Sequence, residues 1–156
     1  KTTLARLVSE RLSLPCFDLD ALIEERTDSS IPELLSRQGE AAFRELESNV
    51  LRTFIDAGAT GIIATGGGTF AIQSNRDLMM ASGITIWLDV PADRLLERVV
   101  GKERPLWGSE TEVKALLKKR CTSYRLAAHR LELRNDSTEQ AANRLYQLIS
   151  AYRDVT

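Results

Sequence analysis

Apolar residues recur along this chain in two patterns that alternate from one segment to the next. In residues 4–12 they fall on one face at helical spacing, which predicts an amphipathic helix. Residues 14–20 (LPCFDLD) and 84–90 (ITIWLDV) are instead short apolar runs of the kind that form strands. Residues 61–65 (GIIAT) make a third such run, typical of a strand buried on both faces of a parallel sheet.

Further helical patterns separate and follow these strands. Ser30 with Pro32 is a helix start, and Ser137 with Gln140 resembles a capping box. The remaining predictions are helices over residues 21–26, 40–57, 75–81, 92–100 and 112–130, a strand over 130–134, and a closing helix that ends near residue 152. Strands that alternate with helices indicate an α/β fold, a parallel sheet with helices on both faces.

Three glycines, Gly66–Gly68, directly follow the buried strand at 61–65. In open α/β sheets, ligands bind beyond the carboxyl ends of the strands. Glycine permits positive φ and lets another group approach the backbone closely. We therefore expect these glycines to line a pocket, with a flexible turn as the alternative.

Two pairs of charged residues are candidates for chemistry. Asp18 and Asp20 are two apart, so they share a face if the chain there is extended, and Asp20 could also cap the helix that follows. Arg44 and Glu47 are three apart, so they are neighbours on one helix face. The alternatives are an N-cap with a surface acid for the first pair, and an exposed ion pair of little energetic value for the second.

Composition narrows the class of protein. The chain has 156 residues, enough for one domain with a proper core, and 43% of them are hydrophobic. The net charge of −1 gives no overall attraction to nucleic acid or to an anionic membrane. No apolar run approaches the length of a membrane span, and Cys16 and Cys121 are typical of a reduced, cytoplasmic protein. A monomer is the default expectation.

Several motifs then recur in an order that is specific. The chain opens on Lys1-Thr2, which matches the tail of the phosphate-binding motif G-x-x-x-x-G-K-[ST], and we expect it to start inside that motif. The motifs that follow are FDLD at 17–20, SIPELLSRQGEAAFRELE at 30–47, ATGGG at 64–68, NR at 75–76, RPL at 104–106 and the spacing from Arg120 to Tyr124. Together they resemble the shikimate kinase family, and they cover most of the chain.

The resemblance implies a single-domain, three-layer P-loop kinase fold that phosphorylates the 3-hydroxyl of shikimate with ATP and Mg²⁺, on the route to chorismate and aromatic amino acids. It implies a substrate-binding segment at about 20–48 and a lid at about 99–110. Lys1 would neutralise the transferring phosphoryl group, and Thr2 and Asp18 would hold Mg²⁺. The residues implied to contact ATP are Lys1, Thr2, Thr3, Arg98 and Arg104.

The same resemblance implies a shikimate site. Asp20 would accept a hydrogen bond from the attacking hydroxyl and take its proton, while Arg44 and Arg120 would grip the carboxylate. Glu47 would fix Arg44, and the backbone of Gly66, Gly67 and Gly68 would hold the other hydroxyls. Arginine suits the carboxylate because its planar group donates two parallel hydrogen bonds.

The chain departs from the family pattern in a few places. Trp107 replaces a second leucine in the lid, residues 121–123 (CTS) replace the usual proline before Tyr124, and His129 replaces an aspartate. We read His129 as a surface residue. Two rivals stay open: another small-molecule kinase such as a gluconate kinase, and a non-catalytic kinase-like binding domain. The residues encoded before Lys1 would help to discriminate them.

Overall fold

The computed structural model describes the backbone of residues 1–99 and 110–153, with their side chains except at 96–99, 110 and 153. The elements in chain order are α1 (Thr2–Leu12), β1 (Cys16–Asp18), α2 (Leu19–Thr27), α3 (Ile31–Asp56), β2 (Ile62–Ala64), the short 3₁₀ helix η1 (Thr69–Ala71), α4 (Gln73–Ser82), β3 (Ile86–Asp89), α5 (Ala92–Val99), α6 (Glu110–Tyr124), β4 (His129–Glu132) and α7 (Thr138–Arg153). This is the predicted alternation of strands and helices.

The strands form two parallel pairs. In the first, β1 runs beside β2 with Asp18 opposite Ala64. In the second, β3 runs beside β4 with Asp89 opposite Glu132. Within the described residues β2 and β3 do not pair with each other. Because β1 and β2 are parallel and end together, Asp18 and the glycines after β2 reach the same edge.

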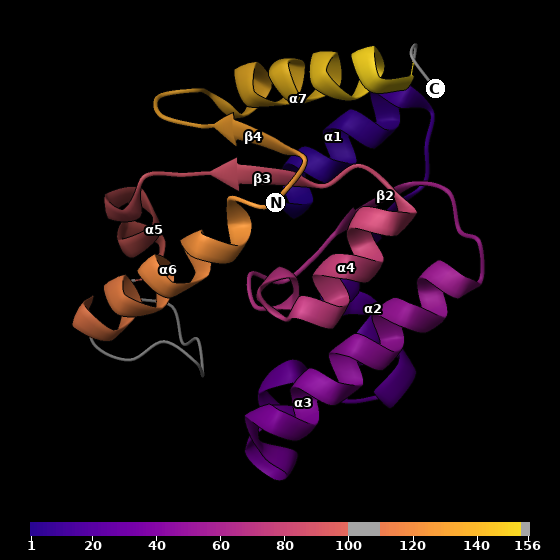
Figure 1. The fold of residues 1–156 in the computed structure, drawn as a ribbon, viewed down its shortest axis with the longest axis vertical. Helices are drawn as coiled ribbons and strands as arrows, with labels where there is room; N and C mark the ends of the chain where they lie inside the picture. Colours follow the sequence, from indigo (N-terminus) through magenta and orange to yellow (C-terminus); the bar gives the residue numbers. More distant parts are fainter. Residues whose placement is uncertain (100–109, 154–156) are drawn as a thin grey trace.

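Two apolar clusters hold the layers together. One joins α1 and α7 over the β3–β4 pair, where Figure 1 shows the two helices side by side; Val8 and Ala142 are fully buried there. The other lies among β2, α2, α3 and α4, with Leu19, Ile23 and Leu51 fully buried. The apolar stripe predicted over residues 4–12 therefore faces the core.

The helix starts were predicted with mixed success. Ser30 and Glu33 form a full capping box at the start of α3. Before α7, the Ser137 N–H donates to Oε1 of Gln140 and the Gln140 N–H donates to Oγ of Ser137, as expected. The cap of α2 was assigned wrongly. It is the Asp18 side chain that accepts from the Asp20 backbone N–H at 3.0 Å, and Asp20 lies in the first turn of the helix. The two aspartates therefore do not share a face of extended chain.

Two further boundaries follow from local geometry. At Gly39 φ is +79°, so α3 is kinked directly before the helix predicted over residues 40–57. The helix predicted over 112–130 ends earlier, at Tyr124, and the strand predicted over 130–134 begins at His129. Thr85 fixes the start of this strand, because its carbonyl oxygen accepts from the His129 N–H and its hydroxyl oxygen accepts from the Ala128 N–H.

Candidate active site

The candidate site is built around the loop of Gly66, Gly67 and Gly68 at the end of β2. None of the three has a positive φ; the described glycines that do are Gly39 and Gly58. What requires glycine here is close approach. A Cβ on Gly68 would lie 2.6 Å from Cζ of Arg44, and a Cβ on Gly67 would lie 3.3 Å from a terminal nitrogen of Arg120. Two arginines distant in sequence thus flank consecutive glycines.

Arg44 donates a hydrogen bond to a buried carboxylate, that of Glu47. Glu47 is 1% exposed, and its Oε2 accepts from Arg44 at 2.8 Å. Its Oε1 accepts from the hydroxyl of Thr69 at 2.7 Å, and Thr69 is fully buried in η1. Arg44 also lies 3.4 Å from the exposed Glu40. The pair predicted from the sequence is therefore a buried network tied to the glycine loop, and the exposed-pair alternative is excluded.

Asp20 approaches the same loop from α2. Its Oδ1 would lie 3.6 Å from a Cβ on Gly66, and Glu47 Oε1 would lie 3.1 Å from that Cβ. Burial raises the pKa of the Asp20 carboxyl above its usual value, against the opposing charge of Lys1; Asp18, Glu47 and Glu24 raise it further. A carboxylate that is partly desolvated in this way is well suited to accept a proton.

A second group of polar side chains meets where β1 and β2 end. The ammonium of Lys1 donates to the Thr65 carbonyl at 2.5 Å, and Thr2 donates to Asp18 Oδ2 at 2.5 Å. The Lys1 charge acts on Asp20, which joins this group to the glycine loop. Thr3 is exposed on α1 beside them.

The chemistry of this second group fits a magnesium site of the kind that kinases use. Hydroxyl and carboxylate oxygens are hard donors, and Mg²⁺ in phosphoryl-transfer sites takes only one or two protein ligands beside phosphates and water. Among the residues described, no cluster of three acidic, histidine or cysteine side chains that could hold a metal occurs.

Two predicted residues cannot be placed. Arg98 belongs to the backbone of α5, but its side chain lies outside the described part of the chain, and so does the whole of Arg104. The loop predicted to act as a lid falls there as well. Roles for these residues stay predictions.

The structure adds contacts that sequence analysis did not assign. Three of these contacts are those of Thr69 with Glu47, of the Thr65 carbonyl with Lys1 and of Glu40 with Arg44. The hydroxyl of Tyr124 donates to the Gly67 carbonyl at 2.5 Å. The available signal was proximity to a recognised motif: Thr65 and Thr69 flank the glycines, and Tyr124 follows Arg120 by one helical turn.

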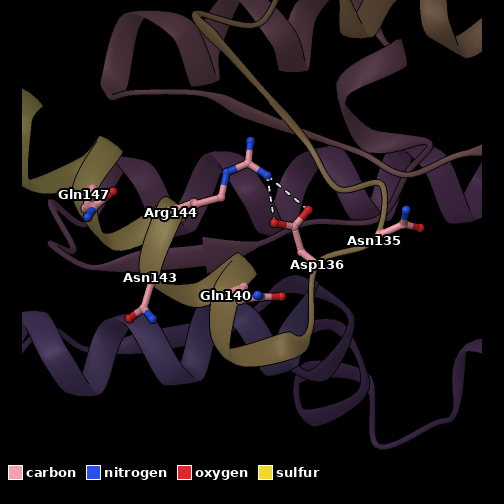
Figure 2. A pocket seen from close by; sticks show the side chains of 6 residues that line it. All are labelled: Asn135, Asp136, Gln140, Asn143, Arg144 and Gln147. Atoms are coloured by element: carbon pink, nitrogen blue, oxygen red, sulfur yellow. Dashed lines mark hydrogen bonds and ion pairs between the residues drawn. The ribbon is translucent and has the colours of Figure 1, made fainter.

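A surface hollow elsewhere in the molecule has different chemistry. It lies over α7 and the turn before it (Figure 2), and its lining residues are Asn135, Asp136, Gln140, Asn143, Arg144 and Gln147. Arg144, the cation among these residues, donates to Asp136 at 2.9 and 3.0 Å and to the Glu132 carbonyl at 2.9 Å. Because these acceptors already compensate the charge of Arg144, the hollow is less suited than the glycine loop to bind an anionic ligand.

The chain matches a known protein family. A family model described as shikimate kinase matches residues 1–150. The chain belongs to the shikimate kinase family. It is 38% identical to a shikimate kinase from Synechococcus sp. (strain CC9605) over 154 residues, which cover 96% of this chain and 76% of that protein.

Solved structures agree with the family. A shikimate kinase from Acinetobacter baumannii in complex with shikimate has a TM-score of 0.89 and 31% identity, over 97% of this chain and 87% of that one. A sugar kinase from Janibacter sp. HTCC2649 has a TM-score of 0.61 and 19% identity over 96% of this chain and 87% of its own, so it shares the fold alone. The predicted fold class, an α/β P-loop kinase, is confirmed. None of the helices in the described part combines the length and apolar character that a membrane crossing needs.

Proposed function

We propose that this protein transfers the γ-phosphoryl group of ATP to the 3-hydroxyl of shikimate, giving shikimate 3-phosphate for the synthesis of chorismate and aromatic amino acids. One observation carries the proposal: two guanidinium groups, from Arg44 and Arg120, and the carboxylate of Asp20 surround one glycine loop. Shikimate offers the matching groups, a carboxylate and a set of ring hydroxyls.

In this proposal the two arginines bind the substrate carboxylate. Glu47 holds one terminal nitrogen of Arg44, so the guanidinium plane is fixed before the substrate arrives. Such preorganisation lowers the ordering cost of binding. The backbone of Gly66–Gly68 would then face the ring hydroxyls, at a distance that any larger residue would prevent.

Asp20 is the proposed acceptor for the hydroxyl that attacks. Its raised pKa favours proton uptake, while the charge of Lys1 opposes that shift and preserves the carboxylate form. Phosphoryl transfer needs little covalent work from the protein, and it needs positioning and compensation of charge above all. The Asp20 carboxylate would supply the positioning, by orienting the attacking hydroxyl.

The nucleotide would bind where Lys1, Thr2 and Asp18 meet. Lys1 would compensate charge on the phosphoryl group, and Thr3 would lie beside the phosphates. Mg²⁺ would be held by the Thr2 hydroxyl with Asp18 through water; when bound, the ion neutralises phosphate oxygens and orients them. Arg98 against the adenine and Arg104 in a lid over the phosphates complete the proposal.

The wider organisation is proposed on the same basis. The chain would act as one domain and as a monomer, with a substrate-binding segment at about 20–48 and a lid at about 99–110. A cytoplasmic location is supported by Cys16 and Cys121, which are both free thiols.

The test is ADP release from Mg-ATP by the protein together with any residues that its gene encodes before Lys1. We expect release that depends on shikimate and is absent with gluconate. Release with gluconate but not with shikimate would point to another small-molecule kinase. Binding of shikimate without release would point to a non-catalytic binding domain, and neither binding nor release would refute the choice of substrate.

A further inference from the structure

Tyr124 links the glycine loop to the carboxylate-binding side of the site. It is the last residue of α6, and its hydroxyl donates to the carbonyl oxygen of Gly67, a residue 57 positions away in the chain. A Cβ on Gly67 would lie 2.9 Å from that hydroxyl and 3.3 Å from Arg120. The loop, the tyrosine and the arginine therefore meet at one point.

The same hydroxyl also interacts with Arg120. The two residues are four apart on α6, so their side chains are neighbours on one face. Burial raises the pKa of the Tyr124 hydroxyl, while the charge of Arg120 and a hydrogen bond to it act in the opposite direction. The tyrosine hydroxyl therefore donates to the loop, and the Arg120 guanidinium lies beside the same glycine.

The ring of Tyr124 packs against the second strand pair. Trp87 of β3 packs against it with ring centroids 5.9 Å apart, and Arg130 of β4 lies 5.0 Å over the Trp87 ring. Arg130 is itself tied to Asp89 through its Nε at 2.8 Å. Packing of Arg130 on Trp87 and of Trp87 on Tyr124 therefore limits how far the Tyr124 ring can move.

We propose that Tyr124 is a positioning residue for the bound acid: its hydroxyl holds Arg120 and the Gly67 backbone at a fixed separation, so that carboxylate and ring hydroxyls are bound together. The inference rests on the proposed function, since it assigns Arg120 to the substrate carboxylate. Tyr124 itself touches neither reacting atom. Removal of the Tyr124 hydroxyl should selectively weaken binding of the acid substrate.

The test compares Tyr124→Phe with the control Tyr146→Phe, which changes a tyrosine of α7 packed against the α1–α7 core. We expect Tyr124→Phe to raise KM and the directly measured Kd for shikimate about five- to tenfold, as the loss of one or two hydrogen bonds implies. The KM for ATP should stay within about twofold, because only the acid side of the site is altered. Tyr146→Phe should resemble wild type in all three.

A double-mutant cycle with Arg120→Ala separates positioning from general loosening. If Tyr124 acts through Arg120, Tyr124→Phe has a smaller effect on shikimate Kd in the Arg120→Ala protein than in wild type; independent effects would multiply. The inference is overturned by an unchanged shikimate Kd in Tyr124→Phe, by a parallel rise in the KM for ATP, or by multiplying effects. Wild-type protein that does not bind shikimate would refute the proposed function as well, and so the two failures are distinguishable.

Discussion

Two arginine–carboxylate pairs in this protein have the same chemistry and opposite surroundings. Arg44 pairs with Glu47, whose side chain is 1% exposed, beneath the glycine loop. Arg144 pairs with Asp136 at the surface hollow, where the arginine side chain is 46% exposed. Glu47 of the first pair also accepts a hydrogen bond from Thr69, next to the glycine loop. Arg144 of the second pair also donates to the Glu132 carbonyl.

The difference shows how burial changes the use of an ion pair. An exposed pair is screened by water and stabilises a protein by at most about 1 kcal/mol. A buried carboxylate has lost its hydration, so it depends on the partners that surround it, and it fixes them in return. Glu47 therefore fixes the Arg44 guanidinium, which in the proposed function binds the substrate, whereas Asp136 and Arg144 compensate each other.

The largest effect, on kcat, is expected for Asp20, which we propose accepts the proton of the attacking hydroxyl. Asp20→Asn removes the proposed proton acceptor, so kcat should fall by about 10²- to 10⁴-fold, the range for loss of a general base, with a smaller change in shikimate KM. The control is Asp28→Asn at the other end of α2, where φ is +49° and asparagine is well tolerated. A kcat for Asp20→Asn within about threefold of wild type would remove Asp20 from the chemistry.

Removing each carboxylate tests the two pairs directly. Glu47→Ala leaves the Arg44 guanidinium without its buried partner and should lower the free energy of unfolding by about 3–5 kcal/mol. Asp136→Ala should lower it by about 1 kcal/mol or less. Urea unfolding of both variants measures the contrast, and equal losses would mean that burial does not distinguish the pairs.

Thr69 tests whether the buried network reaches the substrate. Thr69→Val keeps the shape of the side chain but leaves Glu47 Oε1 without its donor, so stability should fall by about 1–3 kcal/mol. Shikimate KM should rise several-fold because Arg44 loses its fixed anchor. Thr53→Val, on the exposed face of α3, is the matched control. A rise in shikimate KM equal to that of the control would uncouple Thr69 from the site.

The smallest expected effect is a pH-dependent difference in stability. Because burial raises the pKa of Asp20 in the folded protein, protonation favours the folded state, and that contribution is lost as the pH rises through the raised pKa. Asp20→Asn should therefore have a higher Tm than wild type near pH 7. The difference should vanish below the ordinary carboxyl value of 3.8. A difference that grew toward low pH would contradict the direction of the shift.

Sequence analysis predicted those features whose cause is local. The stripe over 4–12, the helix start at Ser30 and the capping box at Ser137 depend on residues close to one another in the sequence. The cap of α2 was assigned wrongly because Asp18 and Asp20 are both good caps, and the choice depends on the residue at which β1 ends and the helix begins. Thr69 was missed because its partner Glu47 is 22 residues away, and their contact exists only after α3 packs on the loop.

The most direct measurement is the affinity for shikimate, by calorimetry without nucleotide, of wild type, Arg44→Ala and Arg144→Ala. We expect Arg44→Ala to weaken binding by about 10- to 100-fold, since hydrogen bonds to a charged group are lost. Arg144→Ala should bind as wild type does. Unchanged affinity in Arg44→Ala, or equal losses in both variants, would contradict the placement of the substrate carboxylate at the glycine loop.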